Sequence, residues 1–299
     1  MKVIAVIVTY NAMKWIDRCM TSLRNSDVPI DIVVIDNGST DGTRDYLPQH
    51  YPDIIWLPQE HNLGFGQANN IGLQYALTHD GDYVLLLNQD AWIDHDMITK
   101  LLSHDDNRTI LSPIHLNGNG NDFDSNFRDN TVLRFSDITS LQELKDNQKV
   151  APFEAKAVAA ACWLVPIAVI RTIGGFNPLF FHYGEDHNFL DRAFYHGFTL
   201  KVILNTFVYH DRKQFGNKRL YQKNLVYRYL LLCATNINTT PHLGNYLHIC
   251  GFWCREGLKH KQLFHFICQS FSGLWQILRH RKQISDSRHK EQTAGLSWL

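Results

Sequence analysis

The segment 83–90, YVLLLNQD, joins an apolar run to polar side chains that could do chemistry. Its last residue, Asp90, puts a carboxylate at the end of a segment whose composition indicates a buried strand. Such a carboxylate costs desolvation free energy unless it is paired or coordinated. Mg²⁺ and Mn²⁺ favour oxygen ligands, and Mg²⁺ is commonly shared between carboxylates and the phosphates of a substrate. We therefore predict that Asp90 binds a divalent cation together with a diphosphate.

Two further polar clusters follow apolar, β-branched segments: Thr9-Tyr10-Asn11 and the segment 36–43, DNGSTDGT. An acidic residue such as Asp36 at the end of a second strand can accept a hydrogen bond from a nucleoside. Asn, Gly, Ser and Asp are also the usual residues of turns and helix caps. The segment alone therefore leaves a nucleoside site and a plain turn equally open.

A fourth cluster, Glu185-Asp186-His187, opens a predicted helix that stops near Gly197. Acidic residues in a first helical turn interact favourably with the helix dipole, so capping is one interpretation. Aromatic neighbours favour a second interpretation, a catalytic base, because an apolar environment raises the pKa of a carboxylate toward that of a working base. His210 ends another apolar run, KVILNTFVYH, and is a second candidate metal ligand, although most lone histidines bind no metal.

Alternating elements must position these side chains. Apolar β-branched runs alternate with helical spacing, which predicts a parallel α/β sheet in the first hundred residues. The expected strands are 2–10, 31–36, 54–58 and 82–88, and the expected helices are 12–23, one from 43, and 66–78. Ligands of such sheets bind beyond the carboxyl ends of the strands, where the first three polar clusters fall. The polar segment 117–130 predicts a mobile loop, and the chain after His210 predicts helices.

Composition bounds the function. The 299 residues are 44% hydrophobic and 19% charged, which is typical of a globular protein with little disorder. Lys and Arg total 29 against 29 Asp and Glu, so no overall charge attracts nucleic acid. Six scattered cysteines indicate reduced thiols, and no apolar run suits a signal peptide or a membrane-spanning helix. We therefore expect a cytoplasmic protein with no nucleic-acid partner.

Two nucleotide-binding motifs are incomplete or missing. Gly64, Gly66 and Gly72 come near a dinucleotide fingerprint, but its third glycine would fall at Asn69, and no glycine loop follows the first strand. The phosphate-binding lysine motif does not occur. The segment after the first strand, TYNAMKW, also lacks the glycine-rich basic loop that a nucleotidyltransferase needs.

Five ordered motifs carry a family resemblance. In chain order they are VIVTYN, VVIDNGSTDGT, NLGFGQANNIG, DYVLLLNQDA and GGFNPLFFHYGEDHNFLDR. Together they resemble the bacterial family-2 glycosyltransferases of the GT-A fold, especially rhamnosyltransferase-like members. The resemblance implies an α/β fold with a mostly parallel central sheet flanked by helices. It covers residues 1–215, a catalytic domain with a nucleotide-binding half (about 1–100) and an acceptor half (about 101–215), and leaves 216–299 as a helical extension.

The resemblance also implies site residues. Its nucleoside positions match Thr9, Asn11 and Asp36, with Asp41 close by, and Asn69 and Asn88 complete the expected donor-binding set. The NQD segment stands where the family has its D-x-D-type motif, so Asp90 carries over as a ligand of Mg²⁺ or Mn²⁺, with His210 as the second candidate. Asn88 replaces the first acid of the stricter motif. Asp186 matches the general base of the family, and Glu185 matches its acidic partner.

The implied activity is that of a metal-dependent, inverting glycosyltransferase of the hexosyltransferase type. It would move a sugar from a UDP- or dTDP-sugar to a hydroxyl of a saccharide or lipid-linked acceptor in polysaccharide assembly, as a rhamnosyltransferase does. A nucleotidyltransferase and a non-catalytic module that binds nucleotide sugars are the alternatives.

The C-terminal region carries its own signal. The segment 255–290 holds eight Lys and Arg against two acidic residues, and an apolar stripe over 263–278 is followed by RHRK. This pattern is typical of a helix that lies in the surface of an anionic membrane. Packing against the catalytic domain or a second subunit explains the stripe equally well. The inner membrane surface is therefore one candidate partner.

Overall fold

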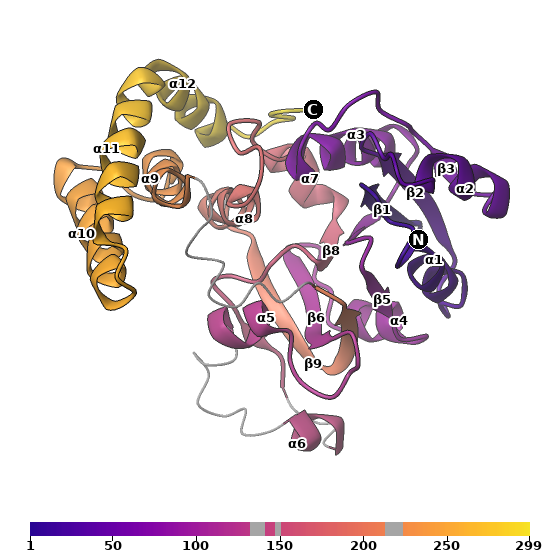
Figure 1. Cartoon of the computed structure of the whole chain (residues 1–299). Coiled ribbons are helices and arrows are strands. Elements are labelled where there is room, and N and C mark those ends of the chain that lie inside the picture. The colour runs from indigo at the N-terminus through magenta and orange to yellow at the C-terminus, as the bar shows by residue number, and fades with distance from the viewer. Residues whose placement is uncertain (132–140, 147–150, 213–223) are drawn as a thin grey trace.

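The first half of the chain forms the parallel sheet that the sequence predicts. The computed structural model describes residues 1–131, 141–146, 151–212 and 224–299 (Figure 1). Strands β1 (Val3–Thr9), β2 (Ile30–Asp36), β3 (Ile55–Trp56) and β4 (Tyr83–Leu87) lie in the order β3-β2-β1-β4 and are parallel. Helices α1 (Ile16–Arg24), α2 (Thr43–His50) and α3 (Phe65–Thr78) connect them. Thr9 and Asp36 end adjacent strands and pair in register, so their side chains reach the same edge.

The sheet continues beyond β4 with a change of direction. Strand β8 (Cys162–Pro166) pairs antiparallel with β4, and the order continues through β6 (Thr109–Asn117) and β9 (Thr199–His210) to β5 (Ala91–Ile93). Strand β7 (Phe153–Glu154) pairs with β9. The helices of this half are α4 (Met97–Leu102), α5 (Ser125–Asn130), α6 (Leu141–Asp146), α7 (Ile167–Ile173) and α8 (Glu185–Tyr195). A mostly parallel sheet with flanking helices confirms the predicted fold class.

Both faces of the sheet are buried, which explains why β1 is apolar at every position. Ile4 and Val6 belong to the core on the side of α3, α7 and α8, whereas Ala5 and Ile7 belong to the core on the side of α1 and α4. Successive residues of a strand point to opposite faces, so a strand with helices on both sides needs apolar residues throughout. Only the strand ends are left to carry polar groups.

The pairing of β6 with β9 contains one irregularity. Pro113 pairs with Ile203, but the next residue, Ile114, pairs with Phe207, so residues 204–206 of β9 have no partner in the ladder. The buried side-chain oxygens of Asn205 and Thr206 have no hydrogen-bond partner. After this bulge the ladder resumes and ends with His210 opposite Asn117.

The segment 117–130, expected to be a mobile loop, is largely structured. Its first residues form a turn that pairs with the end of β6, and α5 follows. Asp124 caps α5 because its side chain accepts hydrogen bonds from the backbone N–H groups of Asn126 and Phe127. Asp124 is only 4% exposed. The polar composition therefore reflects capping and turn formation.

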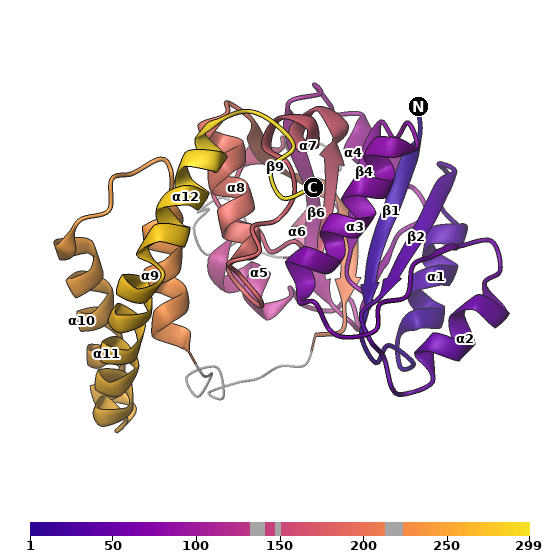
Figure 2. The same ribbon diagram turned by 90° about the horizontal axis from the view of Figure 1, so that it is seen from above.

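Within the described residues after the sheet, the helices are α9 (Leu225–Thr235), α10 (Leu243–Lys259), α11 (Leu263–Arg279) and α12 (Arg281–Gln292). They share a small core that includes Leu230, Phe266 and Ile277. Figure 2 shows α10 and α11 at the side of the molecule remote from α1 and α2, while α12 runs back along α8 toward the C-terminus beside α3 and α7. Within the described residues no helix has the length and apolar character needed to cross a membrane. The predicted domain boundary at residue 215 falls outside the described residues.

Candidate active site

A cavity of about 420 Å³ opens at the carboxyl ends of β1, β2 and β4. Asn88 and Asp90, both predicted from the sequence, line this cavity. Phe181 and His182, from the segment that leads into α8, line its other side. The remaining lining residues are Val8, Tyr10, Asn37, Asn62, Gly64, Phe65 and Gln89. The cavity therefore lies where parallel α/β sheets bind their ligands.

The two candidate metal ligands meet at the rim of this cavity. Nε2 of His210 lies 3.3 Å from Oδ1 of Asp90, and Nδ1 lies 3.4 Å from Oδ2 of Asp124. Burial lowers the pKa of His210, but its contacts with the two carboxylates outweigh burial and raise the pKa to about 9. Burial raises the pKa of Asp90, and the hydrogen bond and charge of His210 more than offset this, so Asp90 is ionised at neutral pH.

These residues fit a divalent cation that is shared with a substrate. Asp90 offers a carboxylate oxygen, and His210 offers an imidazole nitrogen on the same side once a cation displaces the proton on Nε2, while Asp124 contacts the far nitrogen of the ring. Carboxylates behind a ligating imidazole orient it and increase its basicity. In the described part of the chain no group of three or more His, Cys, Asp or Glu side chains is arranged so that it could hold a metal ion. A cation bound here would need oxygens from a diphosphate and water, as Mg²⁺ commonly does.

Thr9 and Asp36, both predicted to hold the nucleoside, hydrogen-bond to each other. The hydroxyl of Thr9 donates to Oδ1 of Asp36 at 3.1 Å, and the backbone N–H of Ser39 donates to Oδ2 at 3.2 Å. Both side chains are fully buried. In this arrangement Asp36 stabilises the turn after β2, as the turn interpretation of segment 36–43 predicts.

Asn11, Asp41 and Asn69 also have partners within the protein. Oδ1 of Asn11 accepts from the N–H of Thr40 at 2.8 Å, and Asn11 has a left-handed backbone with φ of 54°. The carboxylate of Asp41 accepts from the hydroxyl and N–H of Thr43 and caps the start of α2. Asn69 donates to the carbonyl of Phe65, one turn earlier in its own helix. None of the three is among the residues that line the cavity.

Glu185 and Asp186 occupy the first turn of α8 but have different environments. Glu185 is 6% exposed, and burial and the neighbouring charge of Asp186 raise its pKa to about 8. For Asp186 burial acts in the same direction, but the charge and hydrogen bonds of His187 outweigh it and lower the pKa. The raised pKa expected for this cluster is therefore found at Glu185, whereas Asp186 is ionised and able to accept a proton.

Two observations connect this helix to the cavity. A Cβ atom on Gly64, at the start of α3, would lie 2.2 Å from the carbonyl oxygen of Phe181, so the loop before α8 touches the donor-side backbone. The charge of Arg212 lowers the pKa of both Asp90 and Asp186. Both acids therefore feel the charge of Arg212, although Asp186 itself does not line the cavity.

Sequence reasoning missed several polar residues of the site. The side chain of Gln89 accepts from the N–H of Tyr10 and donates to its carbonyl, which joins the ends of β1 and β4. Asn37 donates to Asn62 at 3.1 Å, and each amide oxygen accepts from the backbone of the 62–64 turn. Asp124 was missed because the segment 117–130 has the composition of a loop. For Asn37 and Gln89 the available signal was their position beside Asp36 and Asp90 in the polar clusters.

Known proteins share both the fold and part of the sequence. An N-acetylglucosaminyl-diphospho-decaprenol L-rhamnosyltransferase from Mycobacterium tuberculosis is 26% identical over 230 residues, which cover 69% of this chain and 75% of that protein. TarS residues 1–349 from S. aureus, solved in complex with UDP, superpose with a TM-score of 0.58 at 16% identity over 98% of this chain and 88% of the other. GalNAc-T7, solved with UDP, GalNAc and Mn²⁺, gives a TM-score of 0.58 at 16% identity, over 79% of this chain and 48% of the other.

The two structural matches show a shared GT-A fold. A family model described as glycosyl transferase family 2 matches residues 4–172, which is more than half of the chain. On that match this protein belongs to glycosyl transferase family 2.

Proposed function

We propose that this glycosyltransferase transfers a sugar from a UDP- or dTDP-sugar to an acceptor hydroxyl with inversion at the anomeric carbon. The observation that carries the proposal is the contact between Asp90 and His210 at the rim of the cavity. A carboxylate and an imidazole at this place suit a divalent cation that is shared with the diphosphate of a nucleotide sugar. The UDP complex of TarS supports a nucleotide donor.

The donor is held by the end of the parallel sheet. Asn88 lines the cavity, and Thr9, Asn11, Asp36, Asp41 and Asn69 complete the donor-binding set, partly by fixing the turns after β1 and β2. Residues 1–100 would then form the donor half of a catalytic domain ending near residue 215. Residues 101–215 would form its acceptor half, with 216–299 as the extension.

Asp90 and His210 would hold Mg²⁺ or Mn²⁺. When bound, the cation supplies positive charge that stabilises the departing diphosphate. The Mn²⁺ in the structure of GalNAc-T7 supports a divalent ion. Asp124 keeps the imidazole of His210 oriented, and the cavity walls exclude part of the water around the reacting groups.

Asp186 would act as the general base. The acceptor oxygen forms a bond to the anomeric carbon as the bond from that carbon to the diphosphate oxygen breaks, and the proton of the acceptor hydroxyl passes to Asp186. A single displacement of this kind inverts the anomeric centre. The lowered pKa of Asp186 keeps it ready to accept a proton, while Glu185 stays protonated beside it at neutral pH.

The acceptor is proposed to be a saccharide on a lipid diphosphate, and the sugar to be rhamnose, as the name of the mycobacterial relative suggests. The described part of the chain offers a surface for such a substrate. Phe264, Phe271, Trp275 and Leu278 of α11 are each more than half exposed and lie at helical spacing on one side. Exposed Arg279, Arg281 and Lys282 follow directly. We therefore place the enzyme at the inner face of the membrane, peripherally bound.

The proposed function is tested by comparing wild-type protein with Asp186→Asn. Donor affinity is measured by titration with UDP and dTDP, and turnover by release of the nucleotide from UDP- and dTDP-sugars in the presence of Mn²⁺ and lipid-linked acceptor. The variant is expected to bind nucleotide within about twofold of wild type and to lose turnover by about 100-fold or more. Binding without turnover in the wild-type protein would instead indicate a non-catalytic module.

A further inference from the structure

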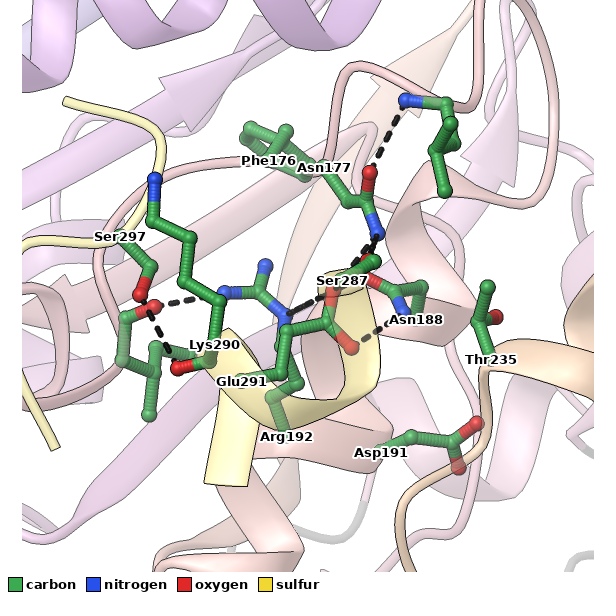
Figure 3. Close-up of polar contacts among 12 residues, drawn as sticks. Phe176, Asn177, Asn188, Asp191, Arg192, Thr235, Ser287, Lys290, Glu291 and Ser297 are labelled. Carbon is green, nitrogen blue, oxygen red and sulfur yellow. Dashed lines mark hydrogen bonds and ion pairs between the residues drawn. The ribbon is translucent and has the colours of Figure 1, made fainter. Parts of the chain in front are cut away.

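The end of α12 is fixed to α8 by a buried ion pair. Nε of Arg192 on α8 lies 3.7 Å from Oε1 of Glu291 on α12, and both side chains are inaccessible to solvent. Figure 3 shows these two side chains at the centre of a cluster that also contains Asn177, Asn188 and Ser287. The cluster joins the last helix of the chain to the helix that carries Glu185 and Asp186.

Arg192 holds the segment before α8. Its Nη1 and Nη2 donate to the carbonyls of Ile173 and Gly175, each at 2.6 Å, and its Nε donates to Oδ1 of Asn188 at 3.1 Å. A planar guanidinium can satisfy several acceptors in one fixed arrangement. The end of α7, the turn at residues 174–175 and α8 are thereby held together.

Glu291 holds the other side of the same turn. Its carboxylate accepts from Asn177 at 2.6 Å and from Ser287 at 3.4 Å. The side-chain oxygen of Asn177 accepts in turn from the backbone N–H of Leu179 at 2.9 Å. Asn177 therefore fixes the start of the loop that supplies Phe181 to the donor cavity and continues into Glu185.

The chain beyond Glu291 reinforces this connection. The N–H of Gly295 donates to the carbonyl of Thr172 at 2.7 Å, and the carbonyl of Ser297 accepts from the N–H of Gly175 at 2.8 Å. Gly174 has a positive φ of 73°, and a Cβ atom there would lie 1.9 Å from the oxygen of Ser297. No larger residue fits at this turn while the C-terminal segment lies across it.

The buried charges of Arg192 and Glu291 favour one particular arrangement of the cluster. Burial raises the pKa of Glu291 and lowers that of Arg192 to about 10, so desolvation opposes both charges. Buried ion pairs seldom add net stability compared with apolar residues, but breaking one partner leaves an uncompensated charge. Arrangements of α8 and α12 that separate the two charges are therefore disfavoured.

We propose that Arg192 and Glu291 are positioning residues, through which the C-terminal helix α12 sets the place of Asp186 at the start of α8. Asp186 and Arg192 are six positions apart in one helix, a rise of about 9 Å, so a tilt of α8 at the cluster is transmitted to its first turn. Neither Arg192 nor Glu291 lines the donor cavity. This proposal rests on the proposed role of Asp186 as the base. It adds a positioning role for Arg192 and Glu291, which lie outside the donor-binding half.

The test uses the full chain with Glu291→Gln and, as a matched control, Asp286→Asn. Both changes convert a carboxylate of α12 to an amide, but Asp286 is exposed. Assays are run well below the melting temperature of each variant. Glu291→Gln is expected to lower kcat at least tenfold, to leave the KM and Kd for the donor within twofold, and to shift the acid limb of the pH–rate profile. Asp286→Asn is expected to match wild type in all of these.

Hydrogen exchange gives a readout that does not depend on turnover. In Glu291→Gln the amides of residues 179–188 should exchange at least fivefold faster, with those of β1, β2 and β4 unchanged. Should Glu291→Gln not fold, Ser287→Ala and Asn177→Ala weaken the same contacts and carry the same measurement. Unchanged exchange and an unchanged pH profile overturn the proposal, as does a parallel loss of donor binding and kcat, which indicates general destabilisation. Full turnover in Asp186→Asn would show that Asp186 is not the base. The exchange measurement would still test the connection between α12 and α8.

Discussion

Nε2 of His210 lies 3.3 Å from Oδ1 of Asp90 because the backbones of β5 and β9 bring them together. Ala91 pairs with His210 in the antiparallel ladder, and the N–H of Asp211 donates to the carbonyl of Asp90 at 2.9 Å. Hydrogen bonds of the main chain thus fix both candidate ligands before any cation arrives. A preformed site of this kind costs little reorganisation on binding.

Asp90→Asn is expected to abolish binding of Mn²⁺ in the presence of UDP and to lower turnover roughly 100-fold or more, because an amide oxygen carries no charge to balance the cation. Calorimetric titration with Mn²⁺ and UDP measures the first effect, and nucleotide release measures the second. The control is Asp27→Asn, which removes an exposed acid elsewhere. Mn²⁺ affinity equal to wild type in the Asp90 variant would rule out this carboxylate as a ligand.

Glu185→Gln is expected to flatten the pH dependence of stability. The pKa of Glu185 is raised from 4.5 to about 8 in the folded protein, so between these values the folded state binds more protons than the unfolded state. Stability therefore falls as pH rises through this window, and the contribution is lost above about pH 8. Thermal midpoints of wild type and variant, measured from about pH 5 to pH 9, should diverge most at the alkaline end.

The control for this measurement is Glu154→Gln, at an exposed position on β7. It should follow the wild-type curve throughout. If Glu185→Gln also follows that curve, Glu185 does not carry the raised pKa.

Gly64→Ala should damage the donor cavity, and Gly42→Ala should not. Both glycines have positive φ, 82° and 96°, so alanine costs about 1–3 kcal/mol of backbone strain at either position. Only at Gly64 would the new Cβ meet the carbonyl of Phe181, at 2.2 Å, whereas nothing lies within 4 Å of it at Gly42. Urea unfolding reports the strain, and UDP titration reports the cavity. Equal losses of UDP affinity in the two variants would contradict the close contact.

Phe271→Ser should weaken binding to anionic vesicles by about 30-fold, since removing a phenyl ring from an apolar environment costs about 2 kcal/mol. Flotation with vesicles of phosphatidylglycerol and phosphatidylcholine measures the bound fraction, and added salt should reduce it through the basic residues of α11 and α12. Tyr195→Ser, at an exposed aromatic residue on α8, serves as the control. A concentration-dependent dimer that Phe271→Ser dissociates would assign the stripe to a second subunit instead.

The sequence predicts the donor half of the fold well because its main strands are continuous apolar runs and its helices carry apolar residues at helical spacing. It also locates Asp90 and His210, since both end apolar runs. Their contact could not be foreseen, because it depends on β5, a strand of three residues with no readable period. Asp124 was unpredictable for a related reason: a helix cap and a loop share the same residue types.

The acidic pair at the start of α8 shows another limit of sequence reasoning. Glu185 and Asp186 are neighbours of almost equal chemistry, and only the fold decides that one is buried and the other faces His187. Glu291 likewise stands in a polar helix, where composition indicates an exposed face. Its burial follows from the return of α12 to α8, a long-range contact that local patterns do not encode.

The interruption in the pairing of β6 and β9 determines which side chain meets Asp90. Were the ladder continuous from Pro113 and Ile203 onward, Asn117 would lie opposite Phe207, and a phenyl ring would stand where the imidazole now is. Residues 204–206 thus act as a spacer that advances the strand by three positions. Deleting these three residues from β9 would leave the sheet intact but would remove the imidazole nitrogen of His210 from the rim of the cavity. The bulge that places His210 there also leaves the buried side-chain oxygens of Asn205 and Thr206 without hydrogen-bond partners.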